Sequence, residues 1–131
     1  MAKLIVVQTG GFAILHCRKL ARELGLTPEQ AYFYGEAWDD LIAEQITPDE
    51  DQILITGSIH GDDLGAHEMV RGFKSMSPRL KVWWCSLLGV QLPNGLYDHM
   101  VDADPYSGYA HYEPMLKKAI EELGMVTTTI K

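Results

Sequence analysis

The sequence predicts a three-layer α/β domain, doubly wound around a five-stranded, mainly parallel sheet. Two observations favour this class. Predominantly apolar runs at Lys3–Val7, which is rich in branched residues, at Ile53–Ile55 and at Lys81–Leu88 are typical of strands buried on both faces. Between them, Phe12–Leu24 and Asp63–Met76 place apolar residues at helical spacing. Strands that alternate with helices form parallel sheets with right-handed crossovers.

The remaining segments supply the other strands and helices of this alternating order. Gly25 follows the first helical segment and is a typical helix-ending residue. In the helix over Asp63–Met76 we expect Leu64 on the core face, together with Met69, Val70 and Phe73. The further elements that we expect are an aromatic strand at Ala31–Tyr34, a short helix at Trp38–Gln45 with Leu41 and Ile42 inward, a strand at Leu96–Val101, an amphipathic helix at Tyr109–Leu123, and a β-prone tail at 126–130 that could add an edge strand.

The segment between the last two predicted strands is short. It contains Pro93-Asn94-Gly95, a strong turn signal that leaves no room for a full helix. We therefore expect the fourth helix of the alternating pattern to be reduced or absent.

Composition and charge limit the number of domains and the classes of partner that this chain is expected to have. A chain of 131 residues that are 47% hydrophobic is expected to form one domain, 1–131. A net charge of −7 argues against nucleic acid or a membrane surface as the partner, because both attract basic faces. The first apolar run is too short for a signal peptide or membrane span, which favours a cytoplasmic location. Cys17 and Cys85 lack metal-ligand spacing and are interpreted as buried small hydrophobes.

The candidate site lies in the stretch Asp51–Gly65, where an apolar strand runs into a loop of small and polar residues. In parallel sheets, ligands bind at the carboxyl ends of the strands. Paired glycines beside helix starts also offer backbone donors for an anion, although no GxGxxG or Walker pattern is present. The candidate ligand-binding residues at this edge are Thr9, Gly10, Gly57, Ser58, His60, Asp62, Asp63, Ser86 and Asp102.

Two interpretations of the acidic residues stay open. His60, Asp62 and Asp63 could hold a divalent ion, or one of the aspartates could cap the following helix. We favour the cap, since it needs only one short polar side chain, and we predict no metal site. Asp102 could join Asp62 and Asp63 in an acidic pocket that also includes Glu36 and Asp104, but ordinary solvated acids are the interpretation that we favour.

The order of elements and the strand–loop junctions resemble response-regulator receiver domains, which have a flavodoxin-like fold. The closest match is ILITGSIHGDDLGAHEMVRGFKSMSPRLKVWWCS, Ile53 to Ser86. It is similar to the family's phosphoacceptor strand, the loop and helix that follow, and the fourth strand. Ser86 falls where the family keeps Thr or Ser.

The residues that carry receiver chemistry are missing. The resemblance places Gln8-Thr9 where the family has its Mg²⁺-binding acids, Thr56 or Gly57 at the acceptor aspartate, and Asp102 or Asp104 near the family's lysine. Neither Thr nor Gly can replace a carboxylate as nucleophile or Mg²⁺ ligand. We therefore expect no catalytic residues, no cofactor and no aspartyl phosphorylation.

The resulting hypothesis is a non-phosphorylatable receiver-like domain that acts in signalling as a protein-interaction or regulatory module, with a homodimer also compatible. Aromatic residues that could form an exposed contact patch support a protein partner: Tyr32, Tyr34, Trp38, Tyr106, Tyr109 and Tyr112. The alternative is a small enzyme or ligand-binding protein for a phosphosugar, nucleotide or metal. A mannose-type sugar-phosphotransferase component is similar in size and in its paired glycines, but Gln8-Thr9 stands where that family has its phosphorylated histidine.

Overall fold

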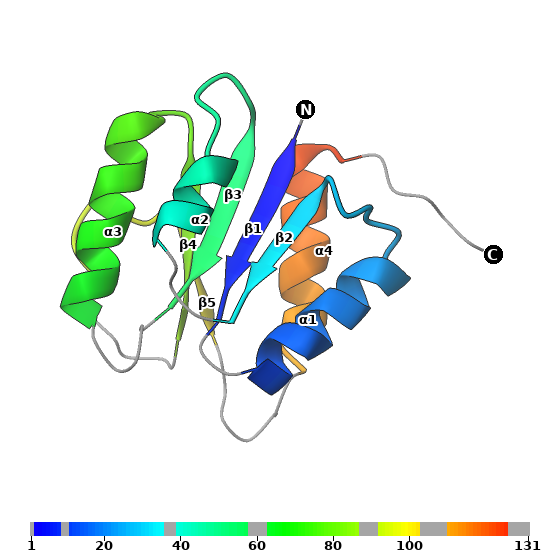
Figure 1. Cartoon of the computed structure of the whole chain (residues 1–131). Helices are drawn as coiled ribbons and strands as arrows, with labels where there is room; N and C mark the ends of the chain where they lie inside the picture. Colours follow the sequence, from blue (N-terminus) through cyan, green and yellow to red (C-terminus); the bar gives the residue numbers. More distant parts are fainter. Residues whose placement is uncertain are drawn as a thin grey trace.

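The chain folds around a five-stranded parallel sheet with strand order β2-β1-β3-β4-β5 (Figure 1). The computed structural model describes residues 2–8, 11–35, 39–57, 63–86, 92–102 and 110–125, of which residues 11, 39, 63 and 86 are described by their backbone alone. The strands are β1 (Lys3–Val7), β2 (Ala31–Tyr34), β3 (Gln52–Thr56), β4 (Lys81–Ser86) and β5 (His99–Asp102), and the helices are α1 (Gly11–Glu23), α2 (Asp39–Gln45), α3 (Asp63–Met76) and α4 (Tyr112–Leu123).

Helices cover both faces of the sheet. Helices α1 and α4 pack on one face and α2 and α3 on the other, so that two apolar clusters flank the strands (Figure 1). The neighbouring residues Trp83 and Trp84 point to opposite faces, as residues next to each other on a strand must. Trp83 belongs to the α1/α4 cluster, whereas the Trp84 ring lies 5.1 Å from that of His67 on α3.

This architecture confirms the predicted fold class, a three-layer, flavodoxin-like α/β domain. The central strands were predictable because each is a continuous apolar run, and all five β3 residues are buried. The last strand, β5, begins at His99 and not at the predicted Leu96. Leu96 is buried as expected, but it lies in the turn before β5.

Residues 92–98, the described part of the segment between β4 and β5, contain no helix and take over part of a helix's packing role. Leu96 joins the cluster beneath α3, and the Tyr97 ring lies 5.1 Å from that of Trp84. The Tyr97 hydroxyl and His67 Nδ1 are 2.7 Å apart, which ties the segment to α3. Asp98 adds a polar link, because its Oδ2 accepts a hydrogen bond from the Val82 N–H at 2.7 Å and another from Lys74 at 3.1 Å.

Replacing Asp98 by alanine should lower the free energy of unfolding by about 1–3 kcal/mol, because it leaves the N–H of buried Val82 without its acceptor. Lys74→Ala removes only the exposed ion pair with Asp98 and should cost less than about 1 kcal/mol. Urea denaturation followed by circular dichroism measures both values. Equal losses in the two variants would show that the Val82 hydrogen bond contributes nothing of its own.

Two predicted core positions are wrong. Leu64 is 77% exposed and Leu41 is 47% exposed. Phe73, which is buried, follows Leu64 by nine residues, or about two and a half helical turns, so the two side chains lie on opposite sides of α3. The core face of α3 is instead formed by Ala66, His67, Met69, Val70 and Phe73.

Both cysteines are free thiols buried in the core, as the sequence predicted. Burial raises the pKa of Cys17 to about 12, and the neighbouring Cys85 adds to this effect. The pKa of Cys85 is also raised to about 12, mainly by burial and further by the Asp102 charge. Since the thiolate is the reactive form, both residues should be inert at ordinary pH.

We expect neither thiol to react with a disulfide reagent between pH 7 and pH 9 while the protein is folded, and both to react in denaturant. The reason is that a pKa near 12 keeps the thiolate population very small throughout this range. Absorbance of the released thiol measures the reaction. Rapid labelling of either cysteine in the native protein would contradict this description of the core.

Candidate carboxyl-edge site

The carboxyl ends of the strands form one edge of the sheet, and the described helices begin beside it (Figure 1). Of the predicted site residues, the structure places four at this edge. Gly57 follows β3, Asp63 begins α3, and Ser86 and Asp102 end β4 and β5. The other five, Thr9, Gly10, Ser58, His60 and Asp62, lie outside the described residues.

Strand register brings two of the candidates together. Ser86 and Asp102 are direct partners across the β4–β5 ladder. Gly57 lies one strand away on the other side of β4, against the backbone of Cys85. The side chain of Asp63, like that of its neighbour Asp62, is not among the described atoms, so the choice between helix cap and metal ligand stays a prediction.

Gly57 occupies a position with no room for a side chain. A Cβ atom placed there would lie 2.5 Å from the Cys85 carbonyl oxygen, well inside van der Waals contact. The preceding residue, Thr56, is completely buried. The end of β3 is therefore closed at both positions, because the β3 and β4 backbones approach each other closely there.

A small pocket of about 200 Å³ lies beside Asp102, between β5 and α4. Its titratable lining residues are His99, Asp102, His111 and Lys118. The His99 ring packs edge-on against Trp83 with the ring centres 5.0 Å apart. Burial lowers the pKa of His99, and the Lys118 charge lowers it further, while Glu122 acts in the opposite direction. The pocket thus brings together two imidazole side chains, of which His99 has a lowered pKa, the carboxyl group of Asp102 and the amino group of Lys118.

The described residues contain no set of three or more His, Cys, Asp or Glu side chains that could hold a metal ion. The described helices also include none that is long and apolar enough to cross a membrane. The predicted aromatic patch is partly wrong, because Tyr112 is buried in the core. Tyr32 and Tyr34 are half-buried, and Trp38, Tyr106 and Tyr109 lie outside the described residues.

Sequence reasoning missed the packed group of His67, Trp84 and Tyr97. His67 lies three positions before the buried Val70 on α3, so helical spacing from Val70 would have placed it inward. It also missed a groove of about 520 Å³ between α1 and β2. The spacing of Arg18 and Arg22, four residues apart on one helix, was the available signal.

Comparisons with known proteins add no family to this picture. No protein-family model matches the chain, and searches of curated proteins and of solved structures found no significant match.

Proposed function

We propose that this chain is a receiver-like domain without phosphotransfer chemistry, which acts as a protein-binding regulatory module. The observation that carries the proposal is the closed end of β3. The receiver resemblance places the phosphoacceptor at Thr56 or Gly57. Thr56 is buried, and even a methyl group at Gly57 would collide with the Cys85 carbonyl. A carboxylate at position 56 would be buried away from solvent, and one at position 57 would have to displace the backbone of β4. Neither position can therefore accommodate an acceptor aspartate in this fold.

Exposed apolar side chains near the same edge support binding rather than catalysis. Phe12 is 81% exposed in the first turn of α1, and Leu64 is 77% exposed in the first turn of α3. Leu15, three residues after Phe12, is also exposed and lies on the same side of α1. Large apolar residues that remain in solvent are more often used in protein contacts than in chemistry.

Site-specific photo-crosslinking in cells tests this function. A photoreactive amino acid at Phe12 or at Leu64 should capture a discrete protein, whereas the same group at Lys117, an exposed residue on α4, serves as the control. The captured protein, once identified and purified, should bind the unmodified chain with a measurable Kd, and the double variant Phe12→Ala/Leu64→Ala should weaken binding tenfold or more. Absence of any saturable complex with the purified candidate contradicts the proposal.

The second candidate, a ligand-binding protein or enzyme, draws support from the pocket beside Asp102 with its histidine and lysine lining. A thermal-shift screen against nucleotides, sugar phosphates and divalent ions separates the two functions. The binding-module proposal predicts no stabilising ligand. A clear shift that is lost in His60→Ala or Asp102→Ala would favour the alternative.

A further inference from the structure

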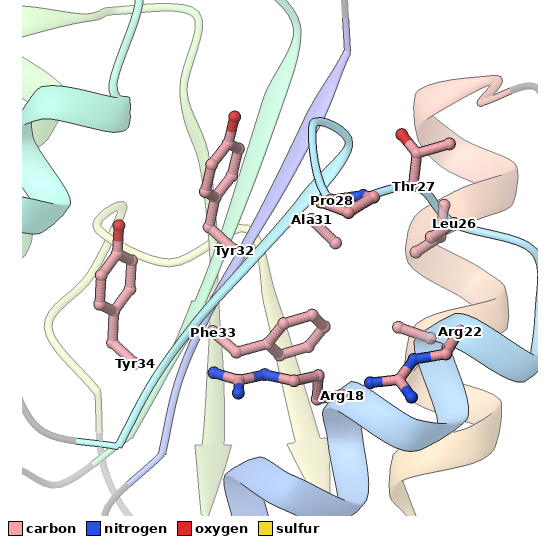
Figure 2. Close-up of a pocket in the computed structure, with 10 residues that line it drawn as sticks. Arg18, Arg22, Leu26, Thr27, Pro28, Ala31, Tyr32, Phe33 and Tyr34 are labelled. Carbon is pink, nitrogen blue, oxygen red and sulfur yellow. The ribbon is translucent and has the colours of Figure 1, made fainter.

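The groove between α1 and β2 is bordered by an edge strand, since β2 lies at the end of the sheet. Its lining includes Arg18 and Arg22 from α1, Pro28 from the connecting turn, and Phe33 from β2. Figure 2 shows Phe33 pointing toward the two arginines, while Tyr32 and Tyr34 project from the opposite face of the strand. The groove therefore gives access to a sheet edge and to side chains on both faces of it.

The backbone of β2 has hydrogen-bonding groups directed to its open side. Leu4 N–H donates to the Gln30 carbonyl, and Gln8 N–H donates to the Tyr34 carbonyl. Because alternate residues of a parallel strand bond to a given neighbour, residues 30, 32 and 34 face β1. The N–H and C=O groups of Ala31 and Phe33 then point away from β1, where no described strand lies. Such an edge is a template for an added strand.

The two arginines give the groove a charge opposite to that of the whole chain. The protein has a formal net charge of −7, yet no ion pair joins Arg18 or Arg22 to a carboxylate among the described residues. Arg71 and Arg79, by contrast, each pair with an acid. Two guanidinium groups that have no acidic partner within the described part of the chain favour carboxylates, which guanidinium groups bind in a two-pronged geometry.

The spacing of the arginines matches an extended peptide. Residues four apart on a helix have Cβ atoms about 5–6 Å apart. Alternate residues of a strand are spaced about 7 Å apart and face the same side. Two carboxylates at alternate positions of a strand laid along β2 would thus meet Arg18 and Arg22. The residue between them would face the side of Tyr32 and Tyr34.

We propose that this groove binds an extended segment of a partner protein, which adds a strand to β2 and presents two acidic side chains at alternate positions to Arg18 and Arg22. The inference rests on the proposed binding function and names its partner's chemistry. An apolar residue between the two acids suits the half-buried tyrosines. A second copy of this chain is a poor occupant, because a two-fold pairing of β2 edges would bring like-charged arginines together.

Selection from a library of displayed random peptides against the full chain tests the proposal. The selected sequences should share an acidic–apolar–acidic pattern, and a synthetic peptide with Glu-Val-Glu at its centre should bind at least tenfold more tightly than its Gln-Val-Gln analogue. Placing the two glutamates next to each other should also weaken binding, because they would then face opposite sides of the added strand and only one could reach the arginines. Fluorescence anisotropy gives the affinities.

Charge reversal provides the sharpest variant. Arg18→Glu/Arg22→Glu should switch the preference from Glu-Val-Glu to Lys-Val-Lys, whereas the matched control Arg71→Glu/Lys117→Glu, which changes the net charge equally on α3 and α4, should leave the preference unchanged. N-methylation of every second peptide residue can start at either of two neighbouring positions. Only the set whose N–H groups bond to β2 should abolish binding when it is methylated. Circular dichroism establishes that the variants are folded.

Three results with the isolated chain would overturn the inference. One is unchanged peptide affinity in the charge-reversed variant, and another is equal binding of fully N-methylated peptide. The third is that a free dicarboxylate such as glutarate binds as tightly as the peptide, which would indicate a small-anion site. A crosslinked partner whose affinity is insensitive to Arg18→Glu/Arg22→Glu would refute this groove while leaving the proposed binding function intact.

Discussion

Replacing Gly57 by alanine should lower the free energy of unfolding by about 2–3 kcal/mol. The added Cβ would lie 2.5 Å from the Cys85 carbonyl oxygen, and both partners are backbone-anchored, so neither can rotate away. The β3–β4 ladder must spread to admit the methyl group. Larger residues should be worse, and an aspartate at position 57 should destabilise the fold without creating a phosphoacceptor.

Gly72→Ala is the matched control for this prediction. Gly72 lies on the exposed side of α3, and a Cβ there would meet nothing within 4 Å. The same substitution should therefore raise stability by about 0.5–1 kcal/mol, because alanine favours the helix and restricts the unfolded chain. Urea titration measures the free energy of unfolding of both variants. A Gly57→Ala protein as stable as the parent would mean that the end of β3 is not closed.

Gln52→Leu should be similarly costly, with a loss of about 2–4 kcal/mol. Gln52 is fully buried, and its amide oxygen accepts the Thr47 N–H at 2.8 Å while its amide nitrogen donates to the Gln45 carbonyl. These bonds satisfy backbone groups at the end of α2 and fix that helix to β3. Leucine would remove the Gln52 amide from both part-buried groups and leave the Gln45 carbonyl with only the Thr47 hydroxyl at 3.5 Å. A buried hydrogen-bonding group left unpaired costs about 1–3 kcal/mol.

Two further variants define the origin of that loss. Gln45→Ala keeps the Gln45 backbone carbonyl and should cost about 1 kcal/mol, since it removes a partly buried side chain and its hydrogen bond with Tyr34. Gln52→Glu keeps the acceptor for Thr47 but turns a second oxygen toward the Gln45 carbonyl, so it should resemble the leucine variant at neutral pH. Thermal and urea unfolding measure these differences, and a neutral effect of Gln52→Leu would contradict the role of this residue.

Much of the fold was predictable because its signals are local. Strand β2 and helix α3 have the predicted bounds, since an aromatic run closed by Gly35 and a helical pattern ended by Ser77-Pro78 contain the necessary information. The helical phase of α3 was less certain, and a strict period of 3.6 residues would have removed Leu64 from the core.

Features that depend on neighbouring strands were not predictable from local patterns. The need for glycine at position 57 arises from the Cys85 carbonyl on β4, which is 28 residues away along the chain. The groove beside Arg18 and Arg22 exists because β2 is an edge strand, and strand order is a tertiary property. Register also explains why Ser86 and Asp102 meet although the sequence separates them.

The central proposal is that this chain works without a phosphorylated aspartate. Intact-protein mass spectrometry after incubation with acetyl phosphate and Mg²⁺ tests it most directly. The closed end of β3 predicts that the mass stays unchanged. A phosphoryl adduct that hydroxylamine removes, and that is lost in Asp62→Asn or Asp63→Asn, would contradict the account.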